Sequence, residues 1–251
     1  MRNYKLGKQD ARPDAIPHRF GSFFSAPDLP TPPLVFGRPD LVKTWGLLAN
    51  DRTSDCVWCD FAHQVMYWNV LAGRPIPQFR DADVLSDYSA QTGYDPRDPR
   101  TDQGTDMAAA ADYFRKTGII DATGYRHRVD ISVTLRPTIE EIALAAYLFG
   151  SVSLGIRLPS SAEDQFDRAE PWGVVAGSTN EGGHDITVVG RNSRDNLLVV
   201  TWGRLQAVEP DFVLAFIDEA IVHLSVEQLR VNDKSRRGYD ETALMAAINK
   251  L

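Results

Sequence analysis

The sequence of 251 residues has little of several features that mark special classes of protein. Its only two cysteines, Cys56 and Cys59, are too few for a disulfide scaffold. No apolar run approaches the roughly 20 residues of a membrane helix, because the longest candidate, residues 139–152, contains Glu140 and Glu141. Lysine and arginine number 27 against 34 acidic residues, and the formal net charge of −7 leaves no basic surface for phosphates. We therefore expect no membrane and no nucleic acid among the partners.

The composition is otherwise that of an ordinary folded protein, with 43% hydrophobic and 24% charged residues. The sequence contains no internal repeat and no low-complexity segment. Its first ten residues are charged and lack the apolar stretch and the small-residue cleavage site of a secretory signal. These observations predict a protein with a substantial core and a cytoplasmic location.

The composition divides the chain into three parts. Residues 1–49 combine prolines with aromatic side chains, which predicts an extended arm, because proline fixes φ and disfavours helix in the residue before it. Residues 50–231 form the predicted core domain, and residues 232–251 a C-terminal tail with a short helix. The prolines of the arm are Pro13, Pro17, Pro27, Pro30, Pro32, Pro33 and Pro39.

The clearest predicted helix runs from Cys56 to Leu71, where apolar residues recur at helical spacing. Ser54 and Asp55 are candidate N-caps, and a glycine follows the last turn. The next residues, 73–105, are rich in proline, aspartate and glycine, and we expect them to form a long surface excursion.

The rest of the core is predicted to be mostly sheet. Alternating or continuous apolar residues predict strands at 129–135, 152–158, 186–189, 197–202 and 220–224. Further helices are expected at 106–116, 138–149 and 211–218. A helical part followed by a twisted antiparallel sheet is an α+β fold.

Cys56 stands at the start of the predicted helix, where a thiol can become a nucleophile. Only the thiolate attacks, and a helix dipole contributes at most about 2 kcal/mol toward forming it. That is about 1.5 pKa units, so a nearby imidazolium is needed as well. Asp55 and Asp60 oppose the thiolate by their charge unless they point away or cap the helix. The best imidazole is His184, because Gly182 and Gly183 before it permit close approach of a substrate.

Three segments resemble those of the papain-like cysteine peptidases. In that family a cysteine opens a helix with an amide side chain six residues earlier, here Cys56 and Asn50. A histidine precedes an apolar run that ends in Val-Gly, here His184 with residues 189–190, and a later strand ends in Trp-Gly, here residues 202–203. Residues 150–156 are similar to the strand before the histidine, so the resemblance covers roughly residues 50–205.

This resemblance implies a papain-like fold that acts on peptide or other amide bonds without a cofactor or metal. Cys56 would be the nucleophile, His184 the proton shuttle, and Asn50 with the backbone N–H of Cys56 the oxyanion hole. Trp202 and Gly183 would line the cleft. The pattern is also similar to uncharacterised bacterial and bacteriophage cysteine-protease-like proteins, which makes a virion-associated location the alternative to the cytoplasm.

One position departs from the family pattern. The asparagine that orients the histidine in the family is Val200 here, and valine cannot hydrogen-bond an imidazole. Thr201 or Asn192 could take over that role, or the protein could work as a Cys/His dyad. The alternative is a catalytically inactive papain-like module with a binding or virion-associated structural role.

The two cysteines allow other interpretations. Cys59 is the alternative nucleophile, with Thr53 six residues earlier, but we prefer Cys56. Cys56, Cys59 and His63 share one helix stripe and could offer zinc ligands, although a fourth ligand is not evident. Buried free thiols and a redox pair are further possibilities. The remaining histidines, His18, His127 and His223, are expected to be surface or capping residues.

Overall fold

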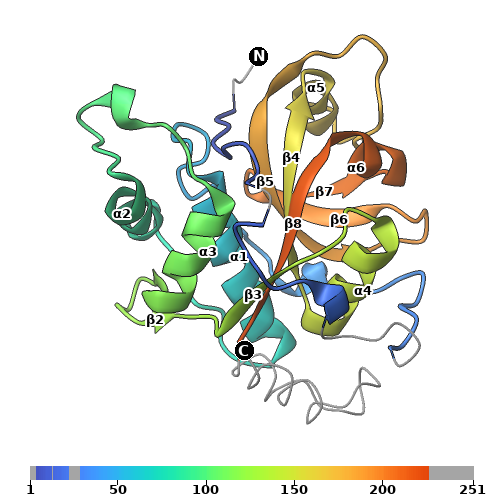
Figure 1. Cartoon of the computed structure of the whole chain (residues 1–251), viewed down its shortest axis with the longest axis horizontal. Coiled ribbons are helices and arrows are strands. Elements are labelled where there is room, and N and C mark those ends of the chain that lie inside the picture. Colours follow the sequence, from blue (N-terminus) through green and yellow to red (C-terminus); the bar gives the residue numbers. More distant parts are fainter. Residues whose placement is uncertain (1–3, 13, 23–28, 226–251) are drawn as a thin grey trace.

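The computed structural model describes residues 4–12, 14–22 and 29–225 (Figure 1). The predicted C-terminal tail, residues 232–251 with a short helix, lies outside the described residues, as do Pro13 and Pro27 of the arm. The α-helices are α1 (Cys56–Leu71), α2 (Asp81–Thr92), α3 (Met107–Lys116), α4 (Ile139–Phe149), α5 (Ser161–Asp167) and α6 (Pro210–Phe216). Short 3₁₀ turns cover Phe20–Ser22, Pro39–Leu41 and Pro99–Thr101.

The strands form a small hairpin and one large antiparallel sheet. The hairpin pairs β1 (Ile119–Ile120) with β2 (Arg126–His127). The large sheet has the order β3-β8-β4-β5-β6-β7, and every neighbouring pair is antiparallel. Its strands are β3 (Ile131–Thr134), β4 (Val152–Pro159), β5 (Asn180–Arg191), β6 (Leu197–Thr201), β7 (Arg204–Val208) and β8 (Ile217–Leu224).

Helix α1 lies between the other early helices and the sheet (Figure 1). Its residues are buried from Cys56 to Trp68 on every side, which is typical of a helix in the centre of a protein. On one side it packs against α2 and α3, and on the other against β5. The helical part and the sheet are therefore joined through the helix that Cys56 begins.

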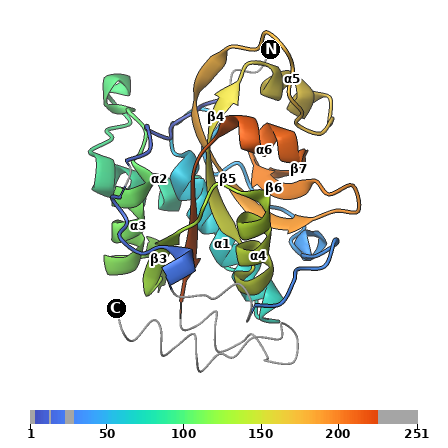
Figure 2. The same cartoon turned by 45° about the vertical axis from the view of Figure 1, so that its right-hand side comes forward.

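The two faces of the sheet carry different layers. Because side chains alternate along a strand, Thr187 of β5 points to α1, where it donates a hydrogen bond to Asp60. Ile186 and Val188 point to the other face, where they pack in one apolar core with α4 and α6 (Figure 2). The α+β architecture predicted from the sequence is confirmed: a helical part packs against an antiparallel sheet that carries His184.

The structure corrects several predicted elements. The surface excursion expected at 73–105 contains the helix α2, at whose start the Asp83 carboxylate accepts hydrogen bonds from the backbone N–H and the guanidinium of Arg80. Strand β5 is much longer than the predicted 186–189, because it continues as a ribbon paired with β4 as far as Asn180. The short helix α5 and the strand β7 were not predicted. Among the described residues no helix is both long and apolar enough to span a membrane.

Candidate active site

Cys56 is the first residue of α1, and an unusual turn precedes it. Leu48 and Ala49 have φ angles of 53° and 76°, a left-handed conformation that is uncommon for residues other than glycine. The backbone N–H of Ser54 then donates to both carboxylate oxygens of Asp102, at 3.1 and 3.2 Å. Asp102 thus holds the loop that leads into Cys56.

The Cys56 thiol is buried, with only 1% of the residue exposed. Burial raises its pKa to about 12, and the nearby carboxyl of Asp185 acts in the same direction. Hydrogen bonds from the backbone of Asp185 and of Gly7 lower it in part. The residue that follows His184 in β5 is therefore in direct contact with the thiol.

The His184 imidazole is held on one edge and on one face. Its Nε2 lies 2.7 Å from the hydroxyl oxygen of Thr201. The indole of Trp202 stacks on the ring at a centroid distance of 4.7 Å and an angle of 20°. The other nitrogen, Nδ1, is buried and has no hydrogen-bond partner among the described residues, so it makes no hydrogen bond to Cys56. Burial lowers the pKa of His184 to about 3, which leaves the ring neutral.

The two candidate orienting residues, Thr201 and Asn192, occupy different places. Thr201 contacts the imidazole. Asn192 lies in the turn between β5 and β6, where its side-chain oxygen accepts hydrogen bonds from the backbone of Arg194 and Asn196. Val200 is buried in the apolar cluster that surrounds Tyr67. Of the two residues proposed to replace the orienting asparagine, only Thr201 meets the ring.

Trp202 and Gly203 make a strained turn that brings two segments together. Trp202 has a φ of 44° and Gly203 one of 74°. Gly203 forms an antiparallel bridge with Gly46, and a Cβ at Gly203 would lie 3.0 Å from the carbonyl carbon of Gly46. This close approach explains the glycine after the tryptophan, and it places the indole over His184.

Burial raises the pKa of both aspartates that oppose a Cys56 thiolate, and Asp55 acts to raise the pKa of the thiol. Asp55 is the N-cap residue of α1 but makes no capping hydrogen bond with its side chain. Burial raises its pKa well above the ordinary value. Asp60 accepts hydrogen bonds from Gln64, Ser153 and Thr187, and burial raises its pKa to about 6.

Asn50 directs its side-chain amide toward backbone carbonyls. Its Nδ2 lies 3.2 Å from the carbonyl oxygen of Thr53 and 3.5 Å from that of Lys5. It also contacts the Asp55 carboxylate, at 3.3 Å. The amide predicted to stabilise an oxyanion therefore reaches a carbonyl of the N-terminal arm.

The arm lies across the Cys56 thiol and explains its burial. The backbone N–H groups of Gly7 and Lys8 donate to the Gly183 carbonyl at 3.1 and 3.0 Å. On the opposite side, Thr105 donates to the carbonyl of Gly7 at 2.6 Å and accepts from Gln9 at 3.0 Å. The arm runs in Figure 1 as the dark blue segment between the helices and the sheet. It is thus fixed to both halves of the protein at the position of Cys56.

Tyr4 of the arm completes the stack around the imidazole. Its ring stacks on Trp202 at a centroid distance of 4.2 Å and an angle of 18°. Its hydroxyl donates to Asp167 of α5 at 2.8 Å. The indole of Trp202 therefore has close stacking partners in both Tyr4 and His184, and the arm is part of the packing of the site.

The other cysteine and its stripe make ordinary structural contacts. The Cys59 thiol lies 3.4 Å from the carbonyl oxygen of Leu48. His63 bonds to the carbonyl of Gly46 at 3.1 Å, and burial lowers its pKa to about 4. No group of three or more histidine, cysteine or acidic side chains within the described ranges could hold a metal ion.

The prediction for His223 is wrong. The residue is completely buried in β8 and is not a surface residue. Its ring is hydrogen-bonded to Ser132 at 2.8 Å and to Ser153 at 3.1 Å, and Ser153 contacts Asp60 of α1. A polar network therefore runs between α1 and the sheet, and the sequence pattern of a strand gives no sign of it.

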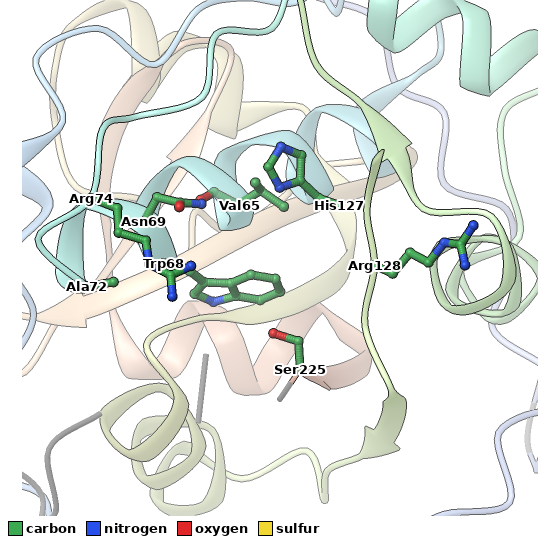
Figure 3. A pocket seen from close by; sticks show the side chains of 8 residues that line it. All are labelled: Val65, Trp68, Asn69, Ala72, Arg74, His127, Arg128 and Ser225. Carbon is green, nitrogen blue, oxygen red and sulfur yellow. The ribbon is translucent and has the colours of Figure 1, made fainter. Parts of the chain in front are cut away.

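A cavity lies at the other end of α1 from Cys56 (Figure 3). It is lined by Trp68 and Asn69 near the end of the helix and by His127 and Arg128 at the hairpin. None of the predicted site residues lines this cavity. At Cys56 itself the arm fills the space between the two halves.

Comparisons with known proteins bear on the fold. No family model matches the chain, and no curated protein matches it. Solved structures do match in fold. Xylellain, a cysteine protease from Xylella fastidiosa, superposes with a TM-score of 0.62 at 11% identity, over 90% of this chain and 99% of that one.

Two further structures give the same result. Procathepsin B from Trypanosoma congolense matches with a TM-score of 0.62 at 14% identity, over 88% of this chain and 86% of its own. A cysteine protease from Carica candamarcensis matches with a TM-score of 0.54 at 13% identity, over 77% of this chain and 99% of its own. The chain therefore has a divergent papain-like fold.

Proposed function

We propose that the protein is a papain-like thiol hydrolase or acyl-transferase that acts on peptide or other amide bonds. Cys56 is the nucleophile in this proposal, His184 the proton shuttle, and Thr201 the positioning residue for the ring. The observation that carries it is the hydrogen bonding of the His184 ring. Nε2 is held by Thr201 beneath Trp202, and Nδ1 makes no hydrogen bond among the described residues. The strand that carries His184 contacts Cys56 through Asp185.

The chemistry follows from these groups. When Nε2 donates its proton to Thr201, Nδ1 is the bare nitrogen and can accept the thiol proton. The Cys56 sulfur attacks the carbonyl carbon, and the oxyanion is stabilised by the Asn50 amide and the Cys56 N–H. The imidazolium then returns its proton to the leaving amine, and a thioester remains. Attack of water on the thioester completes hydrolysis, whereas attack of a second amine completes acyl transfer.

The covered state observed here is a resting state in this proposal. A thiol whose burial raises its pKa to about 12 and an imidazole with a pKa of about 3 do not form an ion pair. Gly7 of the arm contacts the thiol, and the Asn50 amide donates a hydrogen bond to the carbonyl oxygen of Lys5. Withdrawal of the arm would readmit water, lower the thiol pKa and raise the imidazole pKa.

The test is the reaction of Cys56 with iodoacetamide in a chain whose arm has been displaced by the substitution Gly7→Ala. At pH 6 an activated thiol reacts far faster than a free thiol, whose pKa is about 8.5. The same chain with His184→Ala should lose this advantage. Mass spectrometry of the peptides separates Cys56 from Cys59, and hydrolysis of a mixed peptide library measures activity directly.

The rival proposal is an inactive papain-like module with a binding or virion-associated role. Val200 at the position of the orienting asparagine favours it, since valine leaves the ring without an amide partner. Equal alkylation rates with and without His184 in the displaced-arm chain would support the inactive module and contradict the hydrolase.

A further inference from the structure

A large cavity lies between α3, the strand β3 and residues 15–18 of the arm. Its volume is about 490 Å³, which is in the range of small-molecule sites. Ser132 of β3 lines it, and none of the residues proposed for the Cys56 site does. The apolar part of its wall is formed by Ile16, Pro17, Ala108, Ala111 and Ile131.

Ser132 connects this cavity to a buried imidazole. It stands directly opposite His223 in the register of β3 and β8, and its Oγ lies 2.8 Å from Nδ1 of the ring. Ser132 is 9% exposed, whereas His223 is completely buried behind it. The aromatic rings of Phe61 and Phe114 pack on the imidazole at centroid distances of 5.1 and 5.7 Å and hold it in this place.

The hydrogen bonds behind the imidazole fix the position of its proton. Asp60 is ionised above its pKa of about 6, and it accepts a hydrogen bond from the hydroxyl of Ser153. Because a hydroxyl has one proton, Ser153 has none left for the ring and accepts from Nε2 of His223 at 3.1 Å. Nδ1 is then the bare nitrogen, to which Ser132 donates. This is the arrangement of a general base beside a hydroxyl nucleophile.

A donor for an oxyanion is present on the same serine. Alternate residues of a strand direct their N–H groups to the same edge, and the N–H of Thr134 points away from β8 and donates to the His18 carbonyl at 2.8 Å. The N–H of Ser132 therefore points to that edge too, where residues 15–18 of the arm line the cavity. A carbonyl oxygen of a bound molecule can accept a hydrogen bond from this N–H.

We propose that Ser132 is the nucleophile of a second site, with His223 as its general base, and that this site hydrolyses uncharged esters with a small apolar acyl group. Oγ of Ser132 attacks the carbonyl carbon, and Nδ1 of His223 takes the hydroxyl proton. The bond from the carbonyl carbon to the alcohol oxygen breaks, the alcohol leaves with that proton, and an acyl-serine remains. Water then attacks the acyl-serine with the help of the same base, which releases the carboxylic acid and restores the hydroxyl.

The substrate class follows from the base and from the wall of the cavity. Burial lowers the pKa of His223 to about 3, so the ring is a weak base and a weak aid to a poor leaving group. An alcohol leaves more readily than an amine, which favours esters over amides. Asp112 and Asp130 line the cavity together with Arg115, so an anionic substrate is disfavoured. Cys56 takes no part, and the inference is independent of the proposed function.

The test is the labelling of Ser132 by an alkyl fluorophosphonate in the full chain with Cys56→Ala. The reagent forms a phosphorus–oxygen bond with an activated serine and releases fluoride, and mass spectrometry of the peptides identifies the labelled residue. His223→Gln should lower the labelling rate at least about a hundredfold, because a general base contributes roughly 10²–10⁴. The matched control is Ser151→Ala, which should leave the rate unchanged, since this buried serine contacts Gln64 and Trp68 but no imidazole.

Two further variants test the positioning residue and the cavity. Ser153→Ala removes the acceptor of the Nε2 proton and should lower kcat for p-nitrophenyl acetate about fivefold. KM should not change, because Ser153 does not line the cavity. Ala108→Phe fills the cavity and should block the labelling of Ser132.

Circular dichroism shows which variants are folded, and Ser153→Ala decides the role of the imidazole if His223→Gln unfolds. An unlabelled Ser132 in the folded Cys56→Ala chain would overturn the second site. Labelling that persists in Ala108→Phe, or that is equally fast without His223, would also overturn it.

Discussion

The hydroxyl oxygen of Thr201 lies 2.7 Å from Nε2 of His184, beside the indole of Trp202 that stacks on the same ring. A side chain one residue after the position of the family's asparagine therefore supplies the contact that Val200 cannot. Both Thr201 and His184 are at least 97% buried, so water does not compete for this hydrogen bond. The effect of this hydrogen bond on the reactivity of Cys56 can be measured.

Thr201→Val should lower the reactivity of Cys56 about fivefold, because the loss of one hydrogen bond of roughly 1 kcal/mol frees the ring to adopt the other tautomer. The measurement is the alkylation rate of Cys56 at pH 6 in the displaced-arm chain with Gly7→Ala. Thr201→Ser retains the hydroxyl and should restore the rate. A rate that is the same for the valine and serine variants would contradict the positioning role.

Gly7→Ala should expose Cys56 in the otherwise unchanged protein. A Cβ on Gly7 would lie 2.0 Å from the carbonyl oxygen of Ser54, and the rigid backbone there forces the arm to move. We expect alkylation of Cys56 at pH 8 to rise at least about tenfold, which corresponds to roughly 1.4 kcal/mol in the opening equilibrium. The matched control is Gly21→Ala, since a Cβ on Gly21 meets no atom within 4 Å.

If the arm stayed in place, the two alanine variants would react alike. An unchanged rate in Gly7→Ala, with the protein still folded by circular dichroism, would show that the arm is not what protects the thiol.

The pH dependence of Cys56 alkylation should differ between the unsubstituted protein and the Gly7→Ala variant. In the unsubstituted protein burial raises the pKa of this thiol to about 12, so alkylation at pH 8 should be slow. In Gly7→Ala the midpoint should fall below the ordinary value of about 8.5, because water and the His184 imidazolium then stabilise the thiolate. Adding His184→Ala should return the midpoint to 8.5 or higher. A midpoint that does not respond to His184 would favour the inactive module.

His63 should make the stability of the protein depend on pH. Burial lowers its pKa from 6.5 to about 4, so between these values the unfolded chain binds a proton that the folded chain does not. The free energy of unfolding should therefore decrease as the pH falls from 6.5 to 4, by about 1 kcal/mol per pH unit from this residue. Urea unfolding of the unmodified protein and of His63→Gln at pH 4.5, 5.5 and 7 measures the difference. If the free energy of unfolding changes equally with pH in the two proteins, His63 is not the source of the pH dependence.

Local sequence patterns accounted for much of the framework. The apolar spacing after Cys56 indicated the buried helix α1, and the apolar run after His184 indicated a buried strand. Helix α2 was missed because prolines and aspartates surround it; in the structure Asp83 caps its start, and Val84 and Tyr88 bury it in the core. The burial of His223 was missed because its partners, Ser132 and Ser153, come from other strands.

By itself, the sequence determined that the chain folds as an α+β protein in which a thiol opens a buried helix and an imidazole lies on a later strand, since these depend on the spacing of neighbouring residues. Tertiary structure alone decided that Thr201 meets His184, that the arm covers Cys56, and that the side chain of Lys8 packs over Gly155. Such contacts join residues far apart in the chain, and the missing side chain of a glycine has meaning only where another segment comes to fill its place.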